Sequence, residues 1–484
     1  MPSLHFGYEA FGDISERKSA ALFSQHGVEE DLQQHIAQLF AQQLVVLETY
    51  RVIELVRLFD EIGAKRFVRL RGIPFAPFAE IPHERQGFVE GTCLFHALRG
   101  RVAPYFLEGT RWRAYTTRNI NEASMKQSLA RAGVEIDLGA LQRNGAALAR
   151  RAGVPLLPMI KADAYGLGAE AVYRALESLE PWGYGVATVD EGEELRAWGA
   201  SRPVLVFTPL LERELFRARS ARLTPTLGFP KEIDAWRRVG GGPWHLAIDT
   251  GMSRAGIPWR EVGQIRHLLQ LVPPEGAFTH FHSAELDDGT LVAQEKLFKD
   301  AIAALPSRPR LLHADNSGAI ARKGRSQWDL VRPGIFLYGV GSGRSAALQP
   351  EPVVHLRAPI VEIRNLEPGD TVSYGATLRV ERAARIATLA VGYADGYPRS
   401  LSKAGSVLVG GTLAPVAGTV TMDMTMIDVT TVRCEVGDVA TLIGRSGDTV
   451  LTVERVADDA GMSPYELLTG LRSRVARSYI GSPT

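Results

Sequence analysis

The sequence predicts an α/β protein in which a closed (β/α)8 TIM-type barrel is followed by an all-β C-terminal domain and preceded by an extra, mostly helical N-terminal region. Two observations lead to this order. Apolar strand-like runs alternate with amphipathic helical stretches from about residue 134 to 350, and helical patterns nearly vanish beyond that point. We therefore divide the chain into residues 1–130, 131–350 and 351–484.

The barrel is predicted from a repeated strand-then-helix pattern. The strand-like runs are LLPMIKA, GYGVATV, PVLVFTP, RLTPTL, HLAIDTG, GAFTHFHS, RLLHADN and VRPGIFLYG. Most are separated by helical stretches such as GAEAVYRALESL, DEGEELRAWG, WREVGQIRHLLQLV and VAQEKLFKDAIAAL. Eight such units match a closed barrel. An open doubly wound sheet is the alternative, and the lack of GxGxxG after the first strand argues against it.

The first 130 residues have a different character and carry no chemical motif. The stretch EEDLQQHIAQLFAQQLVVLETYRVIELVRLFDEIGAKRF has apolar residues at helical spacing, and RLRGIPFAPFAEIPHERQGF is loop-like and rich in Pro and Gly. A packing or linker appendage is the favoured interpretation. A small regulatory domain and a start assigned too early remain open.

Composition narrows the class of protein. The 484 residues include 55 basic and 54 acidic side chains, so the net charge of +1 gives no reason to propose a nucleic-acid or anionic membrane partner. Cys93 and Cys434 are far apart and form no CxxC pair, so no disulfide framework and no metal site are expected. Without a signal-peptide pattern or an apolar membrane span, we expect a cytoplasmic protein.

Polar residues lie where a barrel places its chemistry, at the carboxyl ends of the strands. Each of them alone is a weak signal, because a single histidine or arginine at a strand end is more often structural. Their convergence on one rim is harder to explain in that way. The residues concerned are Lys161, Arg254, His280, Asn316 with Ser317, and Arg332.

The rim also indicates a ligand. Barrels often bind phosphate with the loops after strands seven and eight, which here contain NSG (316–318) and RPGI (332–335). A phosphate-bearing ligand and a lysine on a neighbouring strand together point to pyridoxal phosphate held as a Schiff base. Lys161 must lose its proton to add to the aldehyde, and a partly buried strand end lowers a lysine pKa.

The chain from about residue 134 to its end resembles the bacterial alanine racemases, a family of barrel-type pyridoxal-phosphate enzymes. Ten motifs in collinear order carry the resemblance over nearly three quarters of the chain. They are KADAYGLG, GVATVDEGEELR, IDTGMSRAGI, THFHSAE, HADNSGA, VRPGIFLYG, VSYGAT, GYADGYPRSL, GTVTMDMTMIDVT and RVARSYIG.

The resemblance implies a role for each matching position. Lys161 and Tyr374 correspond to the two catalytic bases, and Tyr374 is expected to reach the site from the other subunit of a homodimer. The substrate contacts implied are Arg254, the backbone of Met422, and the adjacent Asp423. The cofactor contacts implied, together with those expected from the rim, are Lys161, Tyr165, His280, Asn316, Ser317, Arg332, Gly334, Ile335 and Tyr479.

The sequence departs from the family pattern at three positions. Many members have a carbamylated lysine seven residues before the substrate-binding arginine, and Ala247 stands there instead. Another group must then orient Arg254, which leaves substrate affinity and specificity open. Asp315 replaces a usually small residue, and Glu285 replaces the common Asp at the entrance; both changes look tolerable.

Several functions are consistent with these residues. The first is an alanine racemase that supplies D-alanine for peptidoglycan, with the ring of Tyr479 keeping the pocket small. The second is a serine or broader-specificity racemase, which the Ala247 departure keeps open. A non-catalytic pyridoxal-phosphate homeostasis protein is disfavoured because such proteins generally lack the β domain. A barrel-fold decarboxylase is disfavoured because its C-terminal acidic-substrate or cysteine motif is not found here.

Overall fold

The computed structural model describes residues 131–343, 346–402 and 404–481, and the backbone of three strands nearer the N-terminus. Those strands form an antiparallel sheet in the order β1 (Leu94–Leu98), β2 (Arg101–Glu108) and β3 (Arg111–Ala114). The chain divides into two units, Met1–Thr116 and Thr117–Thr484. The helical pattern expected near residues 29–67 lies outside the described residues.

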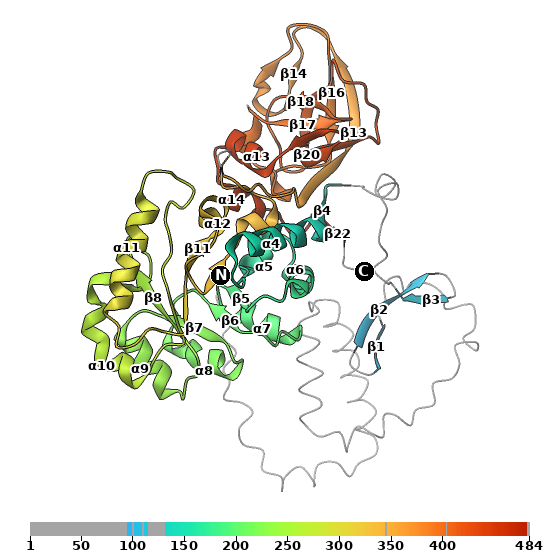
Figure 1. The fold of residues 1–484 in the computed structure, drawn as a ribbon. Helices are drawn as coiled ribbons and strands as arrows, with labels where there is room; N and C mark the ends of the chain where they lie inside the picture. The colour runs from blue at the N-terminus through green and yellow to red at the C-terminus, as the bar shows by residue number, and fades with distance from the viewer. Residues whose placement is uncertain are drawn as a thin grey trace, which may run out of the picture. The chain divides into compact units, whose positions relative to one another are not determined.

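Seven parallel strands build the wall of a near-closed barrel (Figure 1). In space they follow the order β12-β11-β10-β8-β7-β6-β5. Their bounds are Tyr184–Val186 for β5, Val204–Val206 for β6, Thr224–Leu227 for β7, His245–Asp249 for β8, Gly276–Phe278 for β10, Leu311–Asn316 for β11 and Leu330–Arg332 for β12. A two-residue strand, β9 (Ile257–Pro258), pairs with the end of β8.

The predicted first strand, LLPMIKA, closes the ring without being a regular strand. It makes two isolated parallel bridges, from Leu156 to Val331 of β12 and from Met159 to Gly185 of β5. Pro155 and Pro158 explain the interruption, because neither has an N–H to donate to a neighbouring strand. The segment therefore occupies the place of the eighth strand with only part of its hydrogen bonds.

Helices follow the strands and lie on the outer side of the ring (Figure 1). The last predicted strand, VRPGIFLYG, is shorter than expected, since its second half turns into the 3-10 helix η7 (Ile335–Tyr338). The other helices of this region are α4 (Leu138–Ala152), α5 (Lys161–Gly166), α6 (Ala169–Leu176), η5 (Glu177–Leu179), α7 (Val189–Ala197), α8 (Glu212–Ser220), α9 (Pro230–Arg238), η6 (Trp259–Ile265), α10 (Arg266–Leu271), α11 (Thr290–Ala303) and α12 (Ser317–Lys323).

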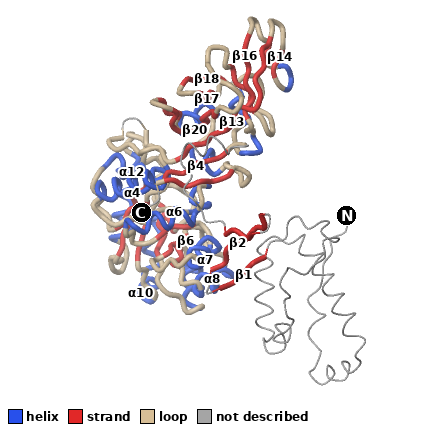
Figure 2. Tube along the Cα trace, turned by 90° about the vertical axis from the view of Figure 1, so that its right-hand side faces the viewer, coloured by secondary structure: helices blue, strands red, loops and turns tan. Residues whose placement is uncertain are grey.

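The region after residue 350 is mainly β-structure, as Figure 2 shows by its preponderance of strands. One sheet contains β18-β17-β20-β13-β16-β19 in that spatial order, and a small second sheet pairs β14 with β15. The bounds are Val354–Leu366 for β13, Thr371–Val372 for β14, Leu378–Arg379 for β15, Ala384–Leu389 for β16, Ser406–Val409 for β17, Thr412–Pro415 for β18, Thr425–Asp428 for β19, Val439–Ser446 for β20 and Thr449–Leu451 for β21.

Two features of this region are not in the sequence prediction. Two short helices, α13 (Val453–Ala460) and α14 (Pro464–Thr469), precede the last strand, β22 (Ala476–Ile480). The strand β4 (Gly133–Asp137) comes before the barrel in sequence, yet it pairs with β13 and β22 and so completes the C-terminal sheet. The 3-10 helices η8 (Tyr374–Ala376), η9 (Tyr393–Asp395) and η10 (Arg399–Ser402) lie in loops of this domain.

Buried aliphatic and aromatic side chains of the barrel and of the β domain belong to one continuous core. Of the described helices, none has the length and apolar character that crossing a bilayer requires.

Candidate active site

Lys161 begins an unusual turn at the end of the ring-closing segment. The four residues 162–165 all have left-handed backbone angles, with φ between 52° and 59°. Such angles cost about 1–2 kcal/mol for each residue that is not glycine. The turn therefore persists only because other contacts stabilise it, and it sets the direction in which Lys161 and Tyr165 leave the rim.

Glu191 supplies the most direct of these contacts. One oxygen of its carboxylate accepts the N–H of Ala162 at 2.8 Å, and the other accepts the N–H of Ala187 at 2.7 Å. The same side chain closes the capping box at the start of α7 together with Thr188. One carboxylate thus joins the residue after Lys161 to the end of the neighbouring strand β5.

The surroundings of Lys161 suit a base. Burial lowers the pKa of its ammonium group, the positive charge of Arg254 lowers it further, and Glu191 opposes both effects. A lysine with a lowered pKa is more often neutral near pH 7, and only a neutral amine can attack an aldehyde or accept a proton.

Three of the predicted phosphate-binding residues meet at one place. The Ser317 hydroxyl accepts the N–H of Gly334 at 2.9 Å and that of Phe336 at 3.4 Å. A Cβ added to Gly334 would lie 2.4 Å from the Tyr165 hydroxyl oxygen, so only glycine leaves room there. Tyr165 is only 6% exposed, yet its hydroxyl donates to no described residue. The unpaired hydroxyl of a buried tyrosine, beside a serine hydroxyl and a glycine-lined loop, is suited to a phosphate group.

Tyr479 lies at the outer side of the same loop. Its hydroxyl donates to the carbonyl of Leu167 at 3.1 Å and fills the space that a Cβ on Gly168 would need. Gly168 also has a φ of 96°, so the position requires glycine for two reasons. The phosphate role expected for Tyr479 stays a prediction, since its hydroxyl is bound to the backbone here.

Arg332 lies in the floor of the site and is 3% exposed. Its two terminal nitrogens donate to the carbonyls of Thr279, His313 and Ala314 at 2.7–3.1 Å. Burial lowers its pKa to about 10, so the guanidinium remains charged at neutral pH. Its Nε–H donates to no described residue, which leaves one donor of a buried cation for a ligand.

A chain of histidines continues from Arg332 into the barrel. His313 Nδ1 lies 2.9 Å from Arg332 and must accept, because a guanidinium only donates. His313 Nε2–H therefore donates to His245 Nδ1 at 2.8 Å, and His245 Nε2–H faces the carboxylate of Glu275 at 3.8 Å. Burial lowers the pKa of both imidazoles, which keeps them neutral. Arg332 therefore sets which nitrogen donates and which accepts in each hydrogen bond from His313 to Glu275.

His280 stands beside this chain of histidines and contacts Arg332. Its Nδ1 lies 3.4 Å from Arg332. Burial, with the charges of Arg332, Arg254 and Lys161, lowers its pKa to about 3. His280 is therefore neutral near pH 7.

Arg254 borders a cavity of about 80 Å³ that is also lined by Ala247, Thr226, Phe278 and His280. Ala247 is 8% exposed and contributes only a methyl group to the wall. Arg254 is exposed and pairs with no carboxylate among the described residues. The space where a lysine side chain would orient Arg254 is open, which agrees with the concern raised by the sequence.

The remaining predicted groups lie in the β domain. Tyr374 is 74% exposed and Met422 is 53% exposed. The turn that presents Tyr374 is held by Thr419, whose carbonyl accepts the Ser373 hydroxyl at 2.7 Å and whose hydroxyl donates to the Tyr374 carbonyl at 3.3 Å. The Tyr374 hydroxyl bonds to no described residue, so its side chain is free to contact another molecule.

Other predicted positions have structural partners. Asn316 caps α12 by accepting the N–H of Ala319 at 3.1 Å. Asp315 is 1% exposed and is tolerated because Ser326 donates to it at 2.6 Å and Lys323 lies 3.3 Å away. The cofactor role of Asn316 stays a prediction. Glu191, His313 and His245 were missed, although the first two lie within motifs that the sequence singles out.

These residues define the class of protein: a barrel enzyme that binds pyridoxal phosphate. The fit rests on the unpaired donors of Tyr165 and Arg332, the glycine-lined loop at Gly334, and a lysine of lowered pKa on the same rim. The Tyr165 hydroxyl suits a phosphate, the Arg332 guanidinium suits a pyridine nitrogen, and the amine of Lys161 suits an aldehyde.

Comparison with known proteins identifies the family. Residues 136–342 match "Alanine racemase, N-terminal domain" and residues 353–479 match "Alanine racemase, C-terminal domain". The chain is 38% identical over 376 residues to an alanine racemase of Citrifermentans bemidjiense, covering 72% of this chain and 98% of the relative. It is 38% identical over 354 residues to that of Deinococcus radiodurans, with coverage of 72% and 99%. The chain belongs to the alanine racemase family.

Solved structures agree with this assignment. The alanine racemase of Enterococcus faecalis matches 72% of this chain and 98% of its own, with a TM-score of 0.68 and 29% identity. The alanine racemase of Bartonella henselae, solved with covalently bound pyridoxal phosphate, matches with a TM-score of 0.67 and 28% identity, over 72% of this chain and all of its own.

Proposed function

We propose that the protein interconverts L-alanine and D-alanine with pyridoxal phosphate as cofactor, and that it supplies D-alanine for peptidoglycan. One observation carries the proposal. Lys161, with a lowered pKa, shares a barrel rim with the phosphate-type cradle of Tyr165, Ser317 and Gly334 and with the cation Arg254. The relatives named alanine racemase, which match nearly their whole length, support the same substrate.

Racemisation needs a proton to leave one face of the α-carbon and another to arrive on the opposite face. Bound pyridoxal phosphate supplies the electron sink that makes the α-proton removable. Lys161 holds and releases a proton at Nζ on one face, and Tyr374 does so at its hydroxyl on the other. Burial and Arg254 favour the neutral form that Lys161 needs in order to accept a proton.

The other residues bind and orient. Arg254 is proposed to attract the substrate carboxylate, and the Met422 N–H to donate to it. Tyr165, Ser317 and the backbone of Gly334 and Ile335 hold the phosphate, with Tyr479 beside them. Arg332 donates toward the pyridine nitrogen. Because its guanidinium stays charged, it keeps that nitrogen unprotonated and restrains the ring as an electron sink, which limits side reactions.

We further propose a homodimer in which Tyr374 and Met422 of one subunit complete the site of the other. Exposed side chains near these residues support it: Tyr374, Tyr393, Met422 and Met424 are all at least 40% exposed on the β domain. Large apolar side chains gathered at a surface are typical of an interface.

The test is a coupled assay for D-alanine on the purified chain. We expect an absorbance band from the lysine-bound cofactor, turnover of L-alanine, and loss of both in Lys161→Ala. A protein with the absorbance band and no amino-acid turnover would contradict the catalytic proposal and favour a cofactor-binding role.

A broader-specificity or serine racemase is the second proposal, and the open space beside Ala247 favours it. The cavity of about 80 Å³ next to Arg254 is bordered at position 247 by a methyl group alone, where a lysine side chain would fill more of the space. A kcat/KM for L-serine equal to or above that for L-alanine would decide for this alternative.

A further inference from the structure

The loop that carries Met422 is a hydrogen-bonded turn that contacts η9. Thr421 donates its N–H to the carbonyl of Met424 at 2.9 Å, and the two residues are bonded again through the Thr421 hydroxyl. The carbonyl of Met422 accepts the N–H of Ala394 at 3.0 Å. The Met422 N–H donates to no described residue, so it remains free for a ligand.

Asp395, in η9, is the buried residue to which the Met422 loop is linked. Its side chain is 3% exposed, and it accepts the N–H of Gly392 at 2.8 Å. Arg474 donates to both of its oxygens, at 2.5 and 3.1 Å. Burial alone raises the pKa of this carboxyl, but the bonds from Arg474 and Gly392 outweigh that effect and lower the pKa. A buried carboxylate needs such partners, so Asp395 holds the guanidinium of Arg474 beside it.

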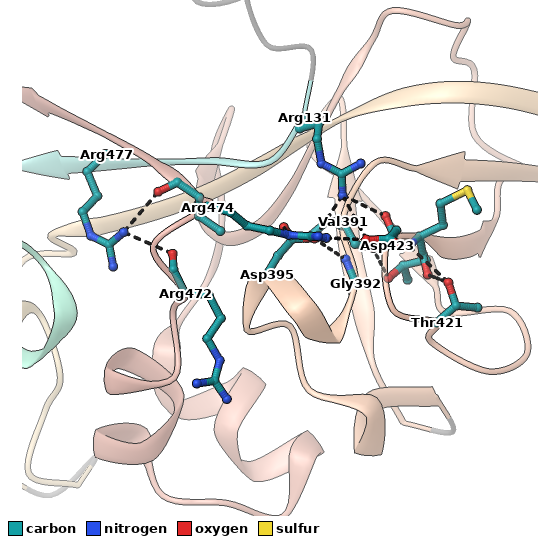
Figure 3. A network of polar contacts seen from close by, with 12 residues as sticks. Arg131, Val391, Gly392, Asp395, Thr421, Asp423, Arg472, Arg474 and Arg477 are labelled. Atoms are coloured by element: carbon teal, nitrogen blue, oxygen red, sulfur yellow. Dashed lines mark hydrogen bonds and ion pairs between the residues drawn. The ribbon is translucent and has the colours of Figure 1, made fainter. Parts of the chain in front are cut away.

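Arg474 also reaches the loop itself. Its terminal nitrogen donates to Asp423 at 2.6 Å, as Figure 3 shows by the side chain stretching from Asp395 to Asp423. Arg131 adds a second link, since it donates to the Asp423 carbonyl at 3.2 Å and to Asp395 at 3.4 Å. A planar guanidinium can serve two carboxylates at once, which a lysine ammonium does less well.

We propose that Arg474 is a positioning residue for the reaction: by joining the buried Asp395 to Asp423, it fixes the Met422 N–H where the substrate carboxylate is bound. The inference rests on the proposed function, which gives Met422 its contact with the substrate. Arg474 itself is not required to touch substrate or cofactor.

The consequence is a selective loss of substrate binding. In Arg474→Ala the loop loses its link to Asp395 through Arg474 and keeps only the longer bonds of Arg131, and in Asp423→Ala it loses the same link while Asp395 keeps its partners. Each variant is expected to raise KM for L-alanine about tenfold, with kcat reduced less than KM is raised and the cofactor absorbance unchanged. The matched control is Arg472→Ala, because Arg472 is exposed and its side chain bonds to no described residue.

A double variant separates positioning from general destabilisation. If both residues act through one contact, Arg474→Ala with Asp423→Ala raises KM no more than the larger single change. Should Arg474→Ala fail to fold, the exposed Asp423→Ala still reports the link. An unchanged KM in Asp423→Ala, with normal turnover in the wild type, overturns the inference and leaves the racemase intact. No turnover in the wild-type chain overturns the proposed function, and with it this inference.

Discussion

Arg254, the proposed ligand of the substrate carboxylate, lies at a cavity without a described side chain that would hold it in place. It lines a cavity of about 80 Å³ that Ala247 leaves open, and no described carboxylate pairs with it. Its contribution to binding is therefore expected to come from its charge and donors alone, without a neighbouring group that holds it in one rotamer.

Replacing this arginine should weaken substrate binding. We expect Arg254→Met to raise KM for L-alanine by about tenfold to a hundredfold, the loss of a charge-assisted hydrogen bond to a carboxylate. Steady-state kinetics on the holoenzyme measure it. Arg260→Met is the control, because Arg260 is also exposed and lies six residues further along. Equal KM values in the two variants would show that Arg254 does not bind the carboxylate.

The buried histidines should make stability depend on pH. The pKa values of His245 and His313 are lowered by burial, so below about pH 6.5 the unfolded chain binds protons that the folded chain does not. The free energy of unfolding should then fall as pH falls, by up to about 1.4 kcal/mol per pH unit for each histidine.

Urea unfolding between pH 8 and pH 5 measures this dependence. His245→Gln is expected to reduce the slope, whereas His267→Gln, at an exposed position, should leave it unchanged. A wild-type stability that is constant between pH 6.5 and pH 5 would contradict the neutral assignment of the two imidazoles.

At the scale of elements, the turn after Lys161 depends on the start of α7. Glu191→Gln keeps the shape of the side chain but leaves one good acceptor for the N–H groups of Ala162 and Ala187. We expect a loss of stability of about 1–3 kcal/mol. Since Glu191 raises the pKa of Lys161, its removal should also move the acid limb of the kcat/KM profile to lower pH.

Thermal unfolding and a pH–rate profile test both effects. Glu193→Gln is the matched control, because Glu193 lies on the same helix and, among the described residues, pairs only with Arg217 at the surface. If Glu191→Gln behaved like the control, the carboxylate would not be what stabilises the left-handed turn.

Much of the fold follows from apolar periodicity, and the exceptions have physical reasons. Seven predicted strands exist because their runs have the length and burial of barrel strands. The run containing Pro155 and Pro158 is irregular because prolines remove ladder donors. The pairing of β4 with β13 involves residues more than 200 positions apart, which local patterns do not reveal. The proposed domain limits near residues 130 and 350 stay predictions.

Site residues at the ends of predicted strands could be proposed from the sequence, whereas contacts between residues far apart in the sequence could not. The predicted strands end at or next to Lys161, Ser317 and Arg332, and the carboxyl ends of barrel strands are where site residues are expected. The histidine chain requires His245 and His313 to meet across two strands, and their positions 68 residues apart give no sign of it. The tie between Arg474 and Asp423 likewise becomes visible only when the loops are placed.

At the scale of the whole molecule, composite sites can be tested by mixing inactive subunits. Lys161→Ala and Tyr374→Phe should each abolish most activity. If Tyr374 serves the partner's site, half of the randomly mixed dimers contain both variants, and one of their two sites is intact. Reassociation of an equal mixture should then restore about a quarter of wild-type activity.

The control is each variant subjected alone to the same dissociation and reassociation. No recovery in the mixture, with dimers formed normally, would show that Lys161 and Tyr374 act within one chain.

The irregular segment that closes the barrel makes folding and cofactor capture interdependent. The stretch whose bridges at Leu156 and Met159 complete the ring also delivers Lys161 to the rim. A chain with an incomplete ring has no correctly placed attachment point, and a ligand that binds only the complete ring shifts the equilibrium toward it. The barrel segment with the least regular strand pairing is thus the one that carries Lys161. Binding of the cofactor is therefore expected to favour molecules whose barrel is completely folded.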